Sequence, residues 1–272
     1  MSCTVSPNNQ YSNTTKNTCI IQCGRFGNQF IRNICASILA KKYNLQFQYS
    51  FYEEILNMGV KLYTEGEKTH PTTIVIKDED FERFMENDLN EDEEPTPRNH
   101  NINLNFIFLQ TATTAKYIRN LLVERKEVIK QHNIFCERYG NNKDTFVHLR
   151  LSDIIPINNG DSVTPLEYYR NTLIKIYKDP QYWDGKLFIS SDEIQHPICQ
   201  SLIKEFDMFH IDLTEILTIQ YASTCANLVL SSGTFSWLMG VFGFYSNIYY
   251  PVVKVKWHGD IFVFDEWNEQ TV

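Results

Sequence analysis

The sequence has no apolar run long enough to cross a bilayer, and its first seventeen residues are polar. This pattern predicts a flexible tail over residues 1–17 and no membrane anchor or secretory leader, so we expect a soluble, cytoplasmic protein. Positive charge is also in short supply: 25 Lys and Arg face 33 Asp and Glu, a net charge of −8. This balance disfavours nucleic acid or an anionic membrane as the main partner, but permits a local basic pocket.

Several patterns of catalytic and metal sites are also missing. Cys19 and Cys23 have a metal-like spacing, but no second pair and no nearby His complete a zinc site. No glycine-flanked serine elbow, no Cys–His pair and no acidic pair beside a phosphate-binding feature is visible. The seven cysteines are odd in number and several lie in apolar runs, which is typical of reduced thiols in a core. We therefore expect neither a metal cofactor nor nucleophilic catalysis.

The second half of the chain alternates short apolar segments with segments of helical period. This alternation predicts a doubly wound parallel sheet of the α/β class. Strands are expected from residue 146 and over residues 186–190, 208–211, 227–231 and 247–252, and helices over residues 165–178, 194–206, 214–226 and 234–242. The residues Thr164-Pro165-Leu166-Glu167 have the signature of a helix start, with Thr164 as the cap.

The first half is a looser version of the same pattern. Strands are expected over residues 18–23, 45–51, 72–76 and 104–109, and helices after a glycine turn at residues 24–30 and over residues 115–132. The polar, turn-forming residues 137–144 suggest a boundary. We expect a first domain over residues 18–140, a second over 141–256 and a tail over 257–272 that packs back on the first domain, with a cleft between the two domains.

The stretch Phe146–Asp153 runs from apolar residues into His, Arg and Asp. Strand alternation places His148 and Arg150 on one face. The planar guanidinium with its five donors suits the oxygens of a phosphate, so this strand end is a candidate anion site. The alternative is an edge strand with a surface salt bridge between Arg150 and Asp153, and the stretch alone does not separate the two interpretations.

Two further polar sets follow predicted strands, at Ser190–Asp192 and at Ser231–Ser236. The carboxyl ends of parallel strands meet at one edge, so these sets should converge with the first. Hydroxyls at the start of a helix combine side-chain donors with backbone N–H groups and the positive end of the helix dipole. Simple helix capping by Thr234 is the alternative. Likewise, Gly24 and Gly27 either cradle a ligand or only permit a tight turn.

Three motifs in this order resemble those of GDP-fucose-dependent fucosyltransferases. They are Gly24-Arg25-Phe26-Gly27-Asn28-Gln29, His148-Leu149-Arg150-Leu151-Ser152-Asp153 and Ser232-Gly233-Thr234-Phe235-Ser236-Trp237. The closest resemblance is to the α-1,2-fucosyltransferase group (glycosyltransferase family 11-like), in which these motifs read Gly-Arg-Leu-Gly-Asn-Gln, His-Ile-Arg-Arg-Gly-Asp and Ser-Thr-Phe-Ser-Trp-Trp. The resemblance covers most of residues 18–243.

The resemblance implies a GT-B enzyme, with two Rossmann-like domains facing a cleft, that transfers L-fucose from GDP-fucose to a glycan hydroxyl with inversion and without a metal. Arg150 would hold the diphosphate and stabilise the leaving group, and Asp153 would be the catalytic base. The other donor contacts would come from His148, Asp192, Ser232, Thr234, Phe235 and Ser236. The first domain would present Gly24, Arg25, Gly27 and Asn28 on the acceptor side of the cleft.

The chain departs from the group in several places. Leu151-Ser152 replaces the usual Arg-Gly, Gly233 lies inside the third motif, Leu238 replaces its second Trp, and Thr218 stands where an acidic residue is expected. These departures leave two alternatives open. One is a related transferase with a different nucleotide sugar, and the other is a non-catalytic protein of the same fold that binds a glycan or a nucleotide.

Overall fold

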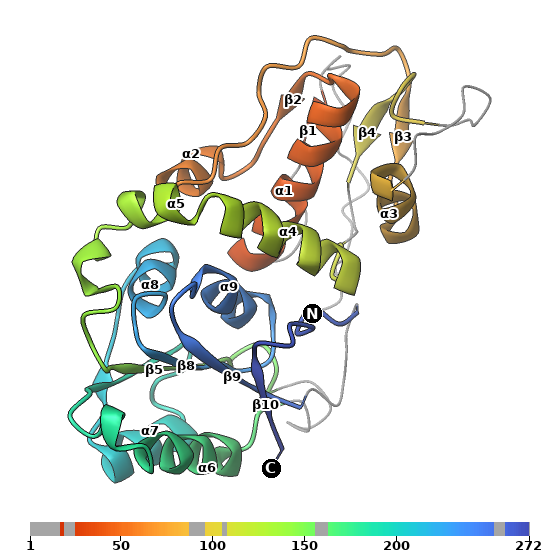
Figure 1. Cartoon of the computed structure of the whole chain (residues 1–272). Helices are drawn as coiled ribbons and strands as arrows, with labels where there is room; N and C mark the ends of the chain where they lie inside the picture. Colours follow the sequence, from red (N-terminus) through yellow and green to blue (C-terminus); the bar gives the residue numbers. More distant parts are fainter. Residues whose placement is uncertain are drawn as a thin grey trace. The chain divides into compact units, whose positions relative to one another are not determined.

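The computed structural model describes residues 17–18, 25–86, 96–104, 108–155, 163–252 and 259–271 (Figure 1). The chain forms two compact units. Unit 1 comprises Met1–Leu56 and Lys61–Thr114, and unit 2 comprises Asn57–Val60 and Ala115–Val272. The turn-forming residues 137–144 therefore lie inside unit 2. Within the described ranges, no helix has both the length and the apolar character needed to traverse a lipid bilayer.

Unit 2 is built on a parallel six-stranded sheet with the order β10-β9-β8-β5-β6-β7. The strands are β5 (Thr145–Leu149), β6 (Leu187–Ser191), β7 (Phe209–His210), β8 (Asn227–Val229), β9 (Asn247–Pro251) and β10 (Asn268–Gln270). Helices α6 (Leu166–Tyr177) and α7 (Pro197–Phe206) cover one face of the sheet, and α8 (Glu215–Ala222) and α9 (Thr234–Phe242) cover the other (Figure 1). The α/β class and the parallel sheet predicted from the alternation are therefore confirmed.

The order of the strands reverses at β5. From β5 the chain moves outward through β6 and β7, then returns to β8 on the other side of β5 and moves outward again. In open parallel sheets, ligands bind beyond the carboxyl ends of the strands at such a reversal. β5 is thus a central strand with a neighbour on each side, and the edge-strand interpretation of this stretch is wrong.

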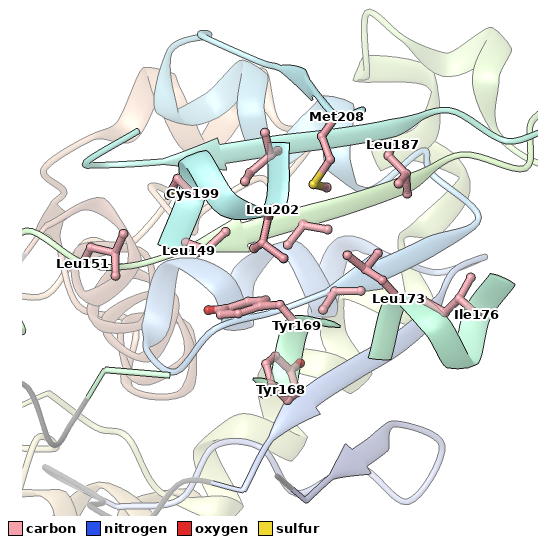
Figure 2. Packing of buried hydrophobic residues seen from close by; sticks show 13 residues of the cluster. Leu149, Leu151, Tyr168, Tyr169, Leu173, Ile176, Leu187, Cys199, Leu202 and Met208 are labelled. Carbon is pink, nitrogen blue, oxygen red and sulfur yellow. The ribbon is translucent and has the colours of Figure 1, made fainter. Parts of the chain in front are cut away.

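The core between the sheet and α6/α7 is mostly aliphatic, with two tyrosines, Cys199 and Met208 (Figure 2). Complete burial of one such aliphatic side chain contributes about 1.5–3 kcal/mol to folding, so the cluster anchors β5 and β6 firmly. The hydroxyl of Tyr168 donates to the carbonyls of Leu230 (2.9 Å) and Tyr249 (3.1 Å), so this buried phenol is satisfied. This packing joins the strands whose carboxyl ends carry the polar residues discussed below.

Several helix boundaries differ from the sequence-based expectation. The cap of α6 is Pro165, and it makes no side-chain cap bond, so the prediction of Thr164 as the cap is wrong. Residues 192–195 form turns, and α7 begins only at Pro197. The helix expected over 115–132 is divided into α4 (Ala112–Glu124) and α5 (Lys126–His132), because Arg125 leaves helical geometry at φ −109° and ψ 9°.

The C-terminal segment, which was expected to pack back on the first domain, adds β10 to the sheet of unit 2. Parallel pairing joins Asn268–Gln270 to Tyr249–Pro251 of β9. The ring of Trp267, just before this strand, is buried against Gly240 of α9. The described part of the segment therefore contributes both an edge strand and core contacts to unit 2.

Unit 1 contains α1 (Phe26–Tyr43), α2 (Tyr52–Asn57) and α3 (Asp78–Glu86). Two two-stranded parallel sheets accompany them: β1 (Asn17–Thr18) with β2 (Phe47–Gln48), and β3 (Thr73–Val75) with β4 (Asn101–Asn103). Among the described residues, unit 2 also contains the short 3-10 turns η1 (Cys136–Arg138) and η3 (Pro180–Tyr182).

Three expectations for unit 1 need correction. α1 begins at Phe26, so Gly27 and Asn28 lie in its first turn rather than in a loop before it. β2 ends early, and Phe51 has a left-handed φ of 54° that no strand accommodates. Leu104 and Leu109 lie outside any strand, while residues 19–24 and 105–107 lie outside the described residues.

Candidate functional site

Arg150 directly follows β5 and forms a two-pronged ion pair with Asp153. Its Nε donates to Oδ1 of Asp153 at 3.0 Å, and its Nη2 donates to Oδ2 at 2.7 Å. The side chains are 28% and 42% exposed, so the pair lies at the surface. The salt bridge of the alternative interpretation therefore exists, although β5 is not an edge strand. The ion pair orients the guanidinium without using its third nitrogen.

That third nitrogen, Nη1 of Arg150, lies against Gly233. A Cβ at position 233 would collide with Nη1 and would approach Cδ of Arg150 to 3.1 Å. Gly233 also has a φ of +116°, which side-chain-bearing residues rarely adopt. Among the described residues, Nη1 makes no hydrogen bond. The glycine that interrupts the third motif thus makes room for the guanidinium.

Gly233 is the cap of α9, and it makes no side-chain cap bond. Helix α9 begins at Thr234, as predicted, but the interpretation of Thr234 as the capping residue is wrong. The first turn of an α-helix carries backbone N–H groups without intrahelical acceptors and the positive end of the helix dipole. The guanidinium of Arg150 and the start of α9 are therefore adjacent sources of positive potential. The flanking hydroxyls of Ser232 and Thr234 are both partly accessible.

A buried polar network joins β5, the end of β8 and α9. Nδ1 of His148 lies 2.5 Å from Oγ of Ser236 and 3.3 Å from Oγ of Ser231. The two serine hydroxyls are 2.8 Å apart, and the Ser231 N–H donates to Ser236 Oγ. The ring of Phe235 lies 5.3 Å from the ring of His148. Because His148 is only 6% exposed, this network holds the imidazole in one orientation.

Tyr169 extends this network and was not singled out as a site residue from the sequence. Its side chain interacts with those of Ser231 and Thr164. Burial raises the pKa of Tyr169, against the opposing effect of these two hydroxyl groups, so the phenol keeps its proton. Its position one turn after a predicted helix start was visible in the sequence, but its direction toward Ser231 depends on how α6 packs on the sheet.

Asp192 lies beyond β6, beside the Arg150 loop. Its Oδ1 accepts from the N–H groups of Leu151 (2.8 Å) and Ser152 (3.3 Å), and its Oδ2 accepts from the Ser152 hydroxyl (2.7 Å). The ladder explains this proximity, since Leu149 pairs with Ser191 at the last register position of the two strands. Ser152 had been noted only as a replacement for the usual glycine, and its hydroxyl bond was not foreseen.

The unit 2 residues expected to converge lie on these adjoining segments: His148, Arg150, Asp153, Asp192, Ser232, Thr234, Phe235 and Ser236. The residues expected on the acceptor side belong to unit 1. There, Arg25 caps α1 with extended backbone, and the Asn28 side-chain oxygen accepts from Gln110 Nε2 at 3.0 Å. Gly27 is buried in α1, and Gly24 lies outside the described residues. Their role beside a cleft stays a prediction.

Two other observations concern ligands. Within the described ranges, no group of three His, Cys, Asp or Glu residues is placed to hold a metal ion. A cavity of about 470 Å³ is lined by Ile174, Tyr177, Lys178, Leu187 and Phe206, and none of the predicted site residues contributes to it. Comparisons with models of known protein families, with curated proteins and with solved structures found no match to this chain.

Proposed function

We propose that this chain is a glycosyltransferase that moves L-fucose from GDP-fucose to a glycan hydroxyl with inversion and without a metal, in the GT-B manner. The proposal rests on the motif resemblance, and the geometry of unit 2 supports its central element, a diphosphate site. The donor would bind at the carboxyl ends of β5 and β8, where the strand order reverses.

One observation carries the proposal: the Arg150 guanidinium lies against Gly233 at the start of α9. A diphosphate placed there would receive hydrogen bonds from Nη1 of Arg150 and from backbone N–H groups of the first helical turn. The hydroxyls of Ser232 and Thr234 flank the same turn and would add donors. Charge that develops on the departing GDP would then be stabilised by groups that are already in place.

His148 and Asp153 have separate parts in this proposal. The imidazole, held by Ser236, would contact phosphate or ribose. Asp153 would accept the proton of the attacking hydroxyl, because each of its carboxylate oxygens keeps an acceptor site that the ion pair with Arg150 does not occupy. The resemblance implies that Arg25 and Asn28, which belong to unit 1, serve the acceptor.

The test is GDP binding and sugar transfer with Arg150→Ala. We expect Arg150→Ala to weaken GDP binding at least tenfold, about 1.4 kcal/mol, and to abolish transfer from GDP-fucose, because a charge-assisted fork to the diphosphate is lost. Calorimetry and released GDP are the measurements. Arg170→Ala is a matched control, because Arg170 forms a similar two-pronged pair with Glu205 on α6 and α7. Normal transfer by Arg150→Ala would contradict the proposal.

A second candidate is a non-catalytic protein of the same fold that binds a nucleotide or a glycan. The ion pair favours it, since two of the three guanidinium nitrogens are already satisfied by Asp153. A panel of GDP- and UDP-sugars, read by released nucleotide, separates the candidates. Turnover with UDP-sugars alone would indicate a related transferase, and GDP binding without any turnover would indicate the binding protein.

A further inference from the structure

The loop over residues 150–153 follows β5, and a side chain that directly follows the neighbouring strand β6 holds it in place. Arg150 and Asp153 bracket Leu151 and Ser152, whose backbone N–H groups both point to the Asp192 carboxylate. The Ser152 hydroxyl donates to the same carboxylate at 2.7 Å. One side chain on the neighbouring strand end therefore accepts three hydrogen bonds from two consecutive residues.

We propose that Asp192 is a positioning residue: it holds residues 150–153 so that the Arg150 guanidinium stays beside Gly233, where it receives an anion. This inference rests on the proposed diphosphate site but assigns Asp192 a different part from the direct donor contact implied by the resemblance. A carboxylate engaged by two amides and a hydroxyl is an acceptor, and it has no proton with which to bind a phosphate oxygen.

If Asp192 is removed, its electrostatic effect and its positioning role predict changes of opposite sign in anion affinity. Coulomb's law says that removing a negative charge beside an anion site strengthens anion binding. Positioning says that removing the acceptor releases two backbone amides and the Ser152 hydroxyl, so the loop loses its preferred conformation and anion binding weakens. The sign of the change in affinity therefore distinguishes a positioning carboxylate from a bystander.

Asparagine at this position separates charge from geometry. In Asp192→Asn, the remaining side-chain oxygen can still accept from the Leu151 and Ser152 N–H groups, and the new NH₂ group can donate to the Ser152 hydroxyl oxygen. Asp192→Ala removes both the charge and the acceptor. Glu193→Ala is the matched control, because it removes one exposed carboxylate from the adjacent position.

The experiment is calorimetric titration of the full chain with inorganic pyrophosphate and with GDP, after circular dichroism has shown that each variant is folded. We expect Asp192→Ala to bind both ligands about tenfold more weakly than wild type, since the hydrogen-bond donors of residues 150–153 lose their fixed positions. Asp192→Asn should bind them at least as tightly as wild type. Ser152→Ala, which loses one of the three bonds, should weaken binding about two- to threefold. Amide hydrogen exchange at Leu151 and Ser152 should be faster in Asp192→Ala than in Asp192→Asn.

Each outcome decides something. If Asp192→Ala binds as tightly as wild type or more tightly, or if Asp192→Asn fails as badly as Asp192→Ala, the positioning role is wrong while the diphosphate site stands. If wild type binds neither pyrophosphate nor GDP, the diphosphate site and the positioning role are both overturned. If Asp192→Ala misfolds, the affinities of Ser152→Ala and Asp192→Asn test the positioning role, because these variants keep most of the acceptor geometry.

Discussion

Position 233 shows how the identity of a single residue depends on a neighbour from another strand. Gly233 combines a φ of +116° with direct contact to the Arg150 side chain. A methyl group there would displace the guanidinium from the start of α9. The glycine that departs from the third motif of the resembling family is therefore explained by the guanidinium beside it.

We predict that Gly233→Ala weakens GDP binding at least tenfold and destabilises the fold by about 1–3 kcal/mol, through backbone strain and collision together. Chemical denaturation and calorimetry measure the two effects. Gly140→Ala is the control, because Gly140 has a φ of +69° and nothing within 4 Å of an added Cβ. That variant should show strain alone, with unchanged GDP affinity. Equal loss of GDP binding in both variants would contradict the steric explanation.

At the scale of elements, α9 connects the candidate site to the C-terminal segment. Its first turn carries Ser236, which bonds His148, and Gly240 two turns from its start contacts the Trp267 ring. The indole is enclosed by aromatic rings, with Phe264 at 4.7 Å and Phe262 at 6.1 Å between centroids. The position of the helix is therefore determined at both ends.

Two effects oppose each other in Gly240→Ala. Replacing a helical glycine by alanine gains about 0.5–1 kcal/mol from helix propensity. The new Cβ, however, would lie 2.5 Å from Cη2 and 2.9 Å from Cζ2 of Trp267, a buried ring with little room to move. Overpacking of this kind costs about 1–3 kcal/mol, so we predict net destabilisation. Urea denaturation is the measurement, and an unchanged or raised midpoint would show that the indole relocates easily.

Elements with strong periodicity were predictable, and their ends were less so. The strands and helices of unit 2 follow from apolar spacing, and α9 starts at Thr234 as expected. The cap of α6 was not predictable from residue types, because Thr164 matches the pattern of a helix start while Pro165 occupies the cap position without a side-chain bond. The break at Arg125 also carries no sequence signal, since neither Gly nor Pro marks it.

The location of the candidate site on the sheet was predictable from the sequence, but its hydrogen bonds were not. Parallel strands imply that His148, Arg150 and Asp192 converge at one edge of the sheet, and the structure of unit 2 confirms this convergence. Which atoms form hydrogen bonds depends on small differences in packing distance, and the periodicity of the sequence does not predict these. The sequence therefore could not distinguish an Asp192 that contacts a ligand from one that accepts bonds from residues 151 and 152.

At the scale of the whole molecule, tyrosine and cysteine side chains with raised pKa values determine how the free energy of unfolding changes at high pH. Burial raises the pKa of Tyr221 to about 12 and that of Cys225 to about 12, and it also raises the pKa values of Tyr168 and Tyr169. Below the unfolded-state values, about 9 for Cys and 10 for Tyr, these groups are protonated in both states and their contribution is complete. Above those values the unfolded chain loses protons that the native state retains, which favours unfolding.

We predict that the free energy of unfolding falls as the pH rises from about 9 to 12. The free energy of unfolding of Tyr221→Phe should decline less steeply between pH 10 and 12. This variant keeps the ring that stacks on Arg138 but lacks the ionisable hydroxyl. Denaturation midpoints at closely spaced pH values measure this. Identical slopes for the variant and wild type would show that Tyr221 does not retain its proton in the native state.

The central position of β5 also has a consequence for how the chain acquires its structure. Its two partners, β6 and β8, lie 42 and 82 residues further along the chain. β5, which is buried along its whole length in the native sheet, therefore stays unpaired on both hydrogen-bonding edges until these distant segments fold. Pairing across such long loops is slow, and an unprotected central strand adheres readily to other copies. Refolding yield should accordingly fall with protein concentration, long before native stability becomes limiting.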